Sequence, residues 1–402
     1  MGLVSLGAAL ATLAGGGRVE ATDQDSEADA PKPPRQGASV RASTEVSAYT
    51  DTDYVHVLSP TVAGSVGDEV AGWSIGGRYL IDAVSAASVD ITSTASGHWV
   101  ENRHVGSATA DFKLAGAGVS LAGGFSREPD YLSLGGGGVV SFELLDKNLL
   151  PFVGGSYGHD EVGRTREATN LWRPMNKVSI KTGATFVVNR STIASVSVDA
   201  IFERGYLAKP YRYIPLFAPG TAASIPAGAS VELVKSANQY SVDENVPTAR
   251  DRFALSGRLA HRWAGTTFRG DQRLYHDSWG LWASTTDVHQ YFDLGRRFVL
   301  WPHGRAHVQR GVDFWRRAFE QIPGAPGEPP GIPVYRAGDR ELGPLYSLTG
   351  GLGVRALVSA DRHAPWALTF QLDAIYTRYL DALYISQRRA LFGSLSFEAG
   401  FD

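Results

Sequence analysis

The chain has 402 residues, with 38 basic and 41 acidic side chains and no cysteine. The missing cysteines exclude disulfide scaffolds, thiolate metal sites and cysteine nucleophiles, and the near balance of charge gives no support for a nucleic-acid partner. A chain without cysteine is suited to crossing an oxidising compartment before it folds.

The N-terminus has the features of an export signal. Residues 2–15 form a short apolar stretch, well below the ~20 residues that a membrane helix needs. Val19-Glu20-Ala21 has the small-x-small form of a cleavage site, which predicts a signal peptide over residues 1–21. Residues 22–38 are rich in Asp, Glu, Pro and Ala and are typical of a disordered linker. The alternative for the first segment is a disordered or buried N-terminal helix.

Later segments lack the run of about 18 apolar residues that marks a membrane helix, so a membrane-spanning form must be a closed sheet. In segment 366–377, one face consists of Trp366, Leu368, Phe370, Leu372, Ala374 and Tyr376. Its terminal aromatic residues lie ten positions apart, which at ~3.3 Å per residue and a ~40° tilt spans roughly 25 Å, the height of a barrel's apolar band. Phe253 and Trp263 repeat this spacing. The pattern predicts an outer-membrane β-barrel over residues 39–402.

The last segment is an amphipathic strand that ends on an aromatic residue. Leu391, Leu395, Phe397 and Phe401 share one face. This arrangement resembles the C-terminal signal read by the outer-membrane assembly machinery, which is therefore an expected partner through the strand ending at Phe401. Asp402 departs from the pattern, which usually ends on the aromatic residue itself. The alternative is an ordinary terminal strand of a soluble β protein.

The lengths of the connections give an independent estimate of strand number. Short turns are predicted near residues 66–69, 114–117, 145–150, 189–192, 264–266, 293–296 and 359–364. Between them lie segments near 51–53, 83–98, 126–130, 159–175, 206–248, 277–280, 311–344 and 380–388. Barrels alternate short turns with longer outer loops, so this order predicts an all-β, antiparallel transmembrane barrel of about 16 strands. Two further strand-like runs, 211–217 and 230–234, make 18 strands the alternative.

Several stretches resemble an uncharacterised family of Gram-negative outer-membrane barrels, known only as a domain of unknown function and porin-like in architecture. The stretches are 51–61, 82–96 with Glu101-Asn-Arg103 after it, and 273–280. The resemblance covers most of the mature chain. It implies an outer-membrane barrel and supplies no established chemistry.

No set of residues for catalysis or metal binding stands out. His276-Asp277 falls in a short loop, while Asp287 and His289 share one strand face and are expected to form a solvated pair rather than part of a catalytic triad. The glycine runs 135–138 and 350–353 lack the strand-to-helix context of a phosphate loop. The sequence predicts no catalytic residue, no metal site and no cofactor.

If the aliphatic row of each strand faces lipid, the alternate row faces the interior. The predicted pore-lining residues are Arg252, Arg258, Arg262, Arg269, Arg273, Trp301, His303, Arg305, His307 and Arg355. Asp271, Asp287, Asp373 and Glu398 share that interior, and Trp99, Tyr157, Tyr275 and Tyr291 take a similar parity. Two interpretations stay open: a salt-bridged wall without selectivity, or a locally positive wall that guides anions.

The long segment 311–344 contains a candidate constriction. Its aromatic residues and arginines interleave as Phe314, Trp315, Arg316, Arg317 and Phe319. This pattern predicts a short amphipathic helix, which either rests in the mouth and narrows the pore or stays outside as a flap.

Together these features predict a transport pore in contact with outer-membrane lipid, passing polar or anionic solutes. Aromatic faces stack on sugar rings and arginines bind carboxylates or phosphates, so polysaccharide export with a separate periplasmic partner is one alternative. A non-conducting structural or adhesive barrel is another. A barrel hydrolase is the last, and the missing catalytic set counts against it.

Overall fold

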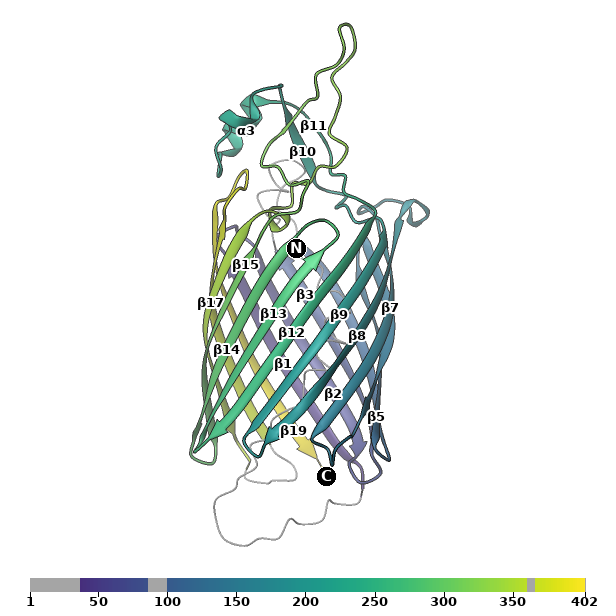
Figure 1. Cartoon of the computed structure of the whole chain (residues 1–402), viewed down its shortest axis with the longest axis vertical. Coiled ribbons are helices and arrows are strands. Elements are labelled where there is room, and N and C mark those ends of the chain that lie inside the picture. Colours follow the sequence, from purple (N-terminus) through teal and green to yellow (C-terminus); the bar gives the residue numbers. More distant parts are fainter. Residues whose placement is uncertain (1–36, 86–99, 360–365, 402) are drawn as a thin grey trace.

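A computed structural model describes residues 37–85, 100–359 and 366–401, and 16 of its strands close into one antiparallel barrel (Figure 1). The barrel strands are β1 (Ser39–Asp51), β2 (His56–Asp68), β3 (Trp73–Ser85), β4 (Val100–Leu114), β5 (Ala117–Glu128), β6 (Tyr131–Phe142), β7 (Leu149–Val162), β8 (Arg173–Asn189), β9 (Thr192–Gly205), β12 (Ala249–Trp263), β13 (Thr266–Asp277), β14 (Trp282–Leu294), β15 (Phe298–Gln309), β17 (Leu345–Leu357), β18 (Trp366–Tyr379) and β19 (Gln387–Phe401). Each pairs with its neighbours in chain order, and β1 pairs with β19 to close the ring. The prediction of about 16 strands is confirmed, and the alternative of 18 is wrong. The predicted signal peptide lies outside the described residues, as does the linker apart from Gly37 and Ala38.

Short and long connections gather at opposite ends of the barrel. One end carries the turns 69–72, 115–116, 143–148, 190–191, 264–265 and 295–297. The other end carries 52–55, 129–130, 163–172, 206–248, 278–281, 310–344 and 380–386. All of these overlap or adjoin the predicted turns and loops, while the connections predicted near 83–98 and 359–364 lie largely outside the described residues. Gly116 and Gly265 complete two-residue turns with φ of 74° and 79°, which glycine adopts without strain.

The outer face of the barrel is apolar because successive side chains of a strand point to opposite faces. On β12, Phe253, Leu255, Leu259 and Trp263 are each between 45% and 48% exposed. Toward the turn end, the exposed aromatic residues are Phe112, Phe142, Phe186, Trp263, Phe292, Phe298, Trp366 and Phe401. Toward the loop end they are Phe125, Tyr157, Phe253 and Trp282. Two aromatic girdles therefore flank an aliphatic band, the surface expected of strands that meet lipid.

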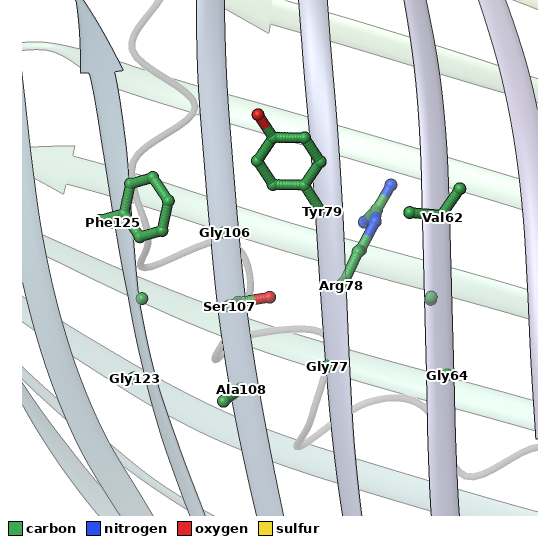
Figure 2. A pocket seen from close by; sticks show the side chains of 12 residues that line it. Val62, Gly64, Gly77, Arg78, Tyr79, Gly106, Ser107, Ala108, Gly123 and Phe125 are labelled. Carbon is green, nitrogen blue, oxygen red and sulfur yellow. The ribbon is translucent and has the colours of Figure 1, made fainter.

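One part of the outer face is hollowed where small residues align across β2 to β5. Gly64, Gly77, Ala108 and Gly123 are successive register partners. Figure 2 shows these four positions below the larger side chains of Val62, Tyr79 and Phe125. The depression has a volume of about 690 Å³. Because glycine has no side chain, the wall here is little thicker than the backbone.

Loops 206–248 and 310–344 fold together into a cap above the loop end of the barrel (Figure 1). Its elements are β10 (Tyr213–Phe217), β11 (Asn238–Asp243), β16 (Phe319–Glu320), α3 (Val231–Ala237), η2 (Ala222–Ser224) and η3 (Arg340–Leu342), while η1 (Thr169–Leu171) lies in the neighbouring loop. The three short strands form one sheet in the order β11-β10-β16. Apolar clusters of the cap bury Ile214, Leu216, Phe217 and Val234. Among the described residues, no helix is long and apolar enough to cross a membrane.

Two sequence predictions about these loops are wrong. The run 230–234 begins a helix rather than a strand, because Ser230 caps it by accepting a hydrogen bond from the Leu233 amide at 3.2 Å. The segment after Gly311 forms no helix up to the short β16. Val312, Phe314 and Trp315 join one apolar cluster and Phe319 joins another, and the Val312 amide donates to the Leu342 carbonyl instead of a helical partner.

Candidate functional site on the inner wall

All ten predicted pore-lining residues lie on barrel strands, at positions that alternate with the lipid-facing row. Arg252, Arg258 and Arg262 are on β12, and Arg269 and Arg273 are on β13. Trp301, His303, Arg305 and His307 follow one another along β15, and Arg355 is on β17. The barrel strands β12, β13, β14, β15 and β17 thus bring these residues to one concave wall.

Six of the seven predicted arginines on this wall make ion pairs. The pairs are Arg252–Glu203 at 2.7 Å, Arg258–Asp271 at 2.5 Å, Arg262–Asp293 at 2.6 Å, Arg269–Asp271 at 2.8 Å, Arg273–Asp199 at 2.7 Å and Arg355–Glu398 at 2.9 Å. Arg305 is exposed and has no ion pair with any described residue. The arrangement favours a largely neutralised, salt-bridged wall over a uniformly positive one.

Aromatic and imidazole rings form a continuous row on β14 and β15. The Tyr291 ring lies 5.8 Å from the Trp301 ring, and 5.9 Å from the His289 ring in parallel orientation. His289 in turn stacks on His303, with ring centroids 4.8 Å apart. Gly353 makes room for this row, because a Cβ at that position would overlap the Trp301 indole.

A second glycine on β17 allows a contact that the sequence did not predict. His303 Nε2 lies 2.7 Å from Asp373 Oδ1, although β15 and β18 are separated by β17. A Cβ at Gly351, between them in the register, would overlap both the imidazole and the carboxylate. The Gly350-Gly351-x-Gly353 run is the sequence feature connected with this contact, because inward-facing glycines leave space for side chains from both neighbouring strands.

Other candidate residues have structural surroundings of their own. His276 stacks on Trp282 at 4.2 Å on the outer face, while the buried Asp277 accepts from Arg250 on the other face, so the two form no dyad. Asp287 and His289 do lie together, at 2.7 Å. Tyr157 is 54% exposed and has the parity of outward-facing Val153, so the inward orientation predicted for it is wrong. Trp99 lies outside the described residues.

The predicted constriction residues belong to the cap. Phe314 packs edge-on against Trp279 at 5.3 Å, and the buried Trp315 donates from Nε1 to the Asp381 carbonyl at 3.1 Å. The neighbouring arginine Arg317 pairs with the Asp381 carboxylate at 2.6 Å, and Arg316 donates to the Trp315 carbonyl at 2.7 Å. Phe319 is buried on β16. These contacts join the segment to neighbouring loops at the loop end of the barrel.

A buried charge network holds the cap together. Asp339 lies 2.8 Å from Arg212 and 3.0 Å from Lys209, and Arg212 also lies 3.6 Å from Glu244. Burial alone would raise the pKa of Asp339, but Arg212 and Lys209 hold that pKa well below its usual range. Burial raises the pKa of Glu244, against the opposing effect of Arg212. Asp339 is therefore the anion around which the two loops meet.

Comparison with known proteins gives one family match. The family model described as "Protein of unknown function (DUF3570)" matches residues 92–368, which confirms the predicted resemblance. The match includes the stretch 273–280 and begins after 51–61. No curated protein matches the sequence.

Several solved structures are similar to this chain at low sequence identity. A bacterial polysaccharide outer membrane secretin has 9% identity and a TM-score of 0.48, over 91% of this chain and 98% of that one. OccD3 (OpdP) from Pseudomonas aeruginosa has 9% identity and a TM-score of 0.44, over 91% and 92%. The siderophore receptor PirA from Pseudomonas aeruginosa has 10% identity and a TM-score of 0.39, over 92% and 81%.

Proposed function

The chain belongs to the DUF3570 family of unknown function, and from its own geometry we propose that it is an outer-membrane pore for polar solutes. The observation that carries this proposal is the contrast between the two faces of the barrel. The outer face is apolar and bordered by aromatic girdles, whereas the inner wall carries seven predicted arginines, six of which pair with acidic side chains. A closed barrel with these faces separates a polar interior from lipid.

The size of the barrel supports passage rather than a filled core. Barrels of 16–18 strands leave an aqueous channel, while barrels of about eight are filled by their own side chains. The buried apolar clusters of the described residues lie among the loops and at the loop end of the barrel. The charged side chains on β12 to β17 would then face water in the channel.

The ion pairs indicate weak selectivity. An arginine that pairs with a carboxylate of its own at less than 3 Å loses most of its field at a distance, because the two charges cancel beyond the pair. Positive charge remains where Arg258 and Arg269 share Asp271 and at Arg305, which is exposed and has no ion-pair partner among the described residues. We therefore expect a pore with a mild preference for anions, centred on Arg305.

Conductance in planar bilayers tests the proposal. The purified barrel should give discrete, ohmic steps, and its reversal potential in a KCl gradient should show a mild anion preference that Arg305→Ala reduces. Arg316→Ala is a matched control, because this arginine is held in the cap by backbone carbonyls. Absence of conductance in both the full chain and a variant lacking residues 312–335 would overturn the pore.

Polysaccharide export is the second candidate, and the ring row favours it. The parallel rings of His289 and Tyr291, continued by Trp301, offer flat faces of the kind that contact sugar rings, next to the free charge of Arg305. A separate periplasmic partner would deliver the chain. Loss of a surface polysaccharide on gene deletion, restored by wild type but not by Trp301→Ala with Arg305→Ala, would support export. Unchanged polysaccharide with reduced uptake of small solutes would exclude it.

A further inference from the structure

Two histidines face each other on the inner wall of the barrel. His289 on β14 and His303 on β15 are direct register partners. Their rings are nearly parallel, with an interplanar angle of 7° and centroids 4.8 Å apart. An imidazole nitrogen lone pair lies in the plane of its ring, so an ion shared by the two histidines has to lie at the nitrogen-bearing edges of the rings rather than between their faces.

Carboxylates approach both rings. Asp287 Oδ1 lies 2.7 Å from His289 Nε2, and Asp373 Oδ1 lies 2.7 Å from His303 Nε2. The second contact crosses an entire strand and exists because Gly351 leaves the space empty. The hydrogen bond between Asp373 and His303 Nε2 fixes the tautomer of that ring and leaves the lone pair on Nδ1, which is the usual arrangement of a metal-binding histidine.

Three buried polar atoms in this group have no hydrogen-bond partner within the described part of the chain. They are His289 Nδ1, His303 Nδ1 and Asp287 Oδ1, whose 2.7 Å approach to His289 Nε2 lacks hydrogen-bond geometry. The His303 side chain is only 7% exposed, and that of His289 is 17% exposed. Burying polar atoms without partners costs free energy, so a ligand that took up these three atoms would stabilise the group.

We propose that Asp287, His289 and His303 bind one divalent transition-metal ion, for which Zn²⁺ is the probe. One ligand-type atom from each of the three side chains lies within 4.8 Å of the others. Zinc bonds of about 2.0–2.2 Å place tetrahedral ligands roughly 3.4 Å apart, so binding has to draw these atoms closer and turn the two imidazoles until their lone pairs meet at one ion. Asp373 is a positioning residue that holds His303 through Nε2. Two imidazoles with a carboxylate suit zinc and its transition-metal neighbours better than Mg²⁺ or Ca²⁺.

The charges around the group are mixed. Arg258 and Arg269 share the single carboxylate of Asp271 and so keep a net positive charge, whereas Asp287 and Asp373 bring two carboxylates to the histidines. Arg305 lies opposite Asp287 in the register, yet the ion pair recorded for Asp287 among the described residues is with His289 and not with an arginine. The Asp287 carboxylate is therefore available to bind a metal ion. The predicted solvated pair of Asp287 and His289 is thus half of a larger group, which only the fold completes by adding His303 and Asp373.

Zinc binding to the folded barrel tests the site directly. After stripping with a chelator, the full chain should bind one Zn²⁺ per barrel in a calorimetric titration, and Co²⁺ in its place should show the visible bands of a site with nitrogen ligands. His289→Ala and His303→Ala should each weaken binding by more than about 100-fold, and Asp373→Asn by about 10- to 100-fold. His307→Ala is the matched control on β15, because His307 bonds Thr285 Oγ1 at 2.8 Å and belongs to no such group.

A glycine pair on β17 gives a second, independent comparison. Gly351→Ala should separate His303 from Asp373 and weaken zinc binding, whereas Gly350→Ala adds a methyl group into open space and should bind as wild type. Heat-modifiable migration checks that every variant is folded. Wild type that binds no Zn²⁺ stoichiometrically, or a doubly substituted His289→Ala, His303→Ala barrel with unchanged affinity, would overturn the site. Neither result depends on conductance, so the site and the pore can fail separately.

Discussion

Asp277→Asn removes the charge of a fully buried carboxylate at the base of the cap. The Asp277 side chain has no exposed surface, and its Oδ2 accepts from Arg250 Nε at 2.9 Å and from the Tyr275 hydroxyl at 2.8 Å. Its Oδ1 accepts from the backbone amides of Trp279 and Leu281 at 2.9 and 3.1 Å. The Arg250 guanidinium also lies 4.3 Å from the centroid of the Trp279 ring. This one carboxylate therefore fixes loop 278–281, on which the cap rests.

The expected cost follows from the charge left behind. Breaking a buried pair by removing one partner costs about 3–5 kcal/mol, because the other charge stays buried without compensation. Asparagine keeps an oxygen for the backbone amides, so the low end, about 3 kcal/mol, applies. Since about 1.4 kcal/mol corresponds to a factor of ten in an equilibrium, the base of the cap should open roughly 100-fold more often.

Limited proteolysis in detergent micelles measures this opening, because cleavage tracks the open population when reclosing is fast. Cuts within 206–248 and 310–344 should accelerate while the barrel strands stay resistant. Asp313→Asn is the control: it removes the same charge from the Arg310 pair, whose side chains are 63% and 66% exposed, and should change the rate less than about threefold. Adding Arg250→Gln to Asp277→Asn should recover part of the loss. Wild-type cleavage rates in Asp277→Asn would refute the reasoning.

Three further predictions concern the cap and the outer surface. Deleting residues 312–335 should leave a folded barrel whose conductance is higher if the cap narrows the pore mouth, and an unchanged conductance would reject the constriction. Arg212 depresses the pKa of Asp339 below 3.8, so ionised Asp339 stabilises the cap above that pH and this stabilisation is lost as the pH falls through the folded pKa. Cleavage of the cap by an acid protease should therefore rise below pH 3.8. The Asp339→Asn variant should not show this rise. Trp366→Ala removes an edge-on contact with the Phe397 ring, whose centroid lies 5.9 Å away, and should destabilise the barrel by about 1 kcal/mol or more, which lowers the temperature of heat modification. Leu368→Ala is the comparison, because it truncates a non-aromatic residue of the same face. Equal shifts of that temperature in the two variants would argue against an aromatic contribution.

The barrel was predictable because lipid imposes a simple rule on every strand. Alternate positions must be apolar where they meet lipid. The sequence of a segment such as 366–377 therefore shows that it is a strand and which of its faces points outward, without any knowledge of the partner strands. The rule fails where the side chains on the two faces of a strand do not differ clearly in polarity. On β7, glycine occurs on both faces, and the prediction therefore assigned Tyr157 to the wrong one.

The cap and the histidine group were not predictable for a different reason. Short apolar runs such as 230–234 fit a strand or a helix, and only Ser230, placed to cap the first turn, decides between them. The contact between His303 and Asp373 joins residues 70 positions apart. It depends on the register of three strands and on the space at Gly351, and neither quantity can be read from one strand alone.

The pairing of β1 with β19 imposes an order on assembly. Every other neighbouring pair in the barrel joins strands that follow one another around the chain, whereas this pair aligns Val40 with Phe401 and Asp51 with Ala390. The ring can therefore seal only after its last strand has arrived. Until that moment two strand edges carry unpaired amide and carbonyl groups, which lipid cannot satisfy. Insertion and sealing must then be a single coupled event, or an outside catalyst must shield both edges until they meet.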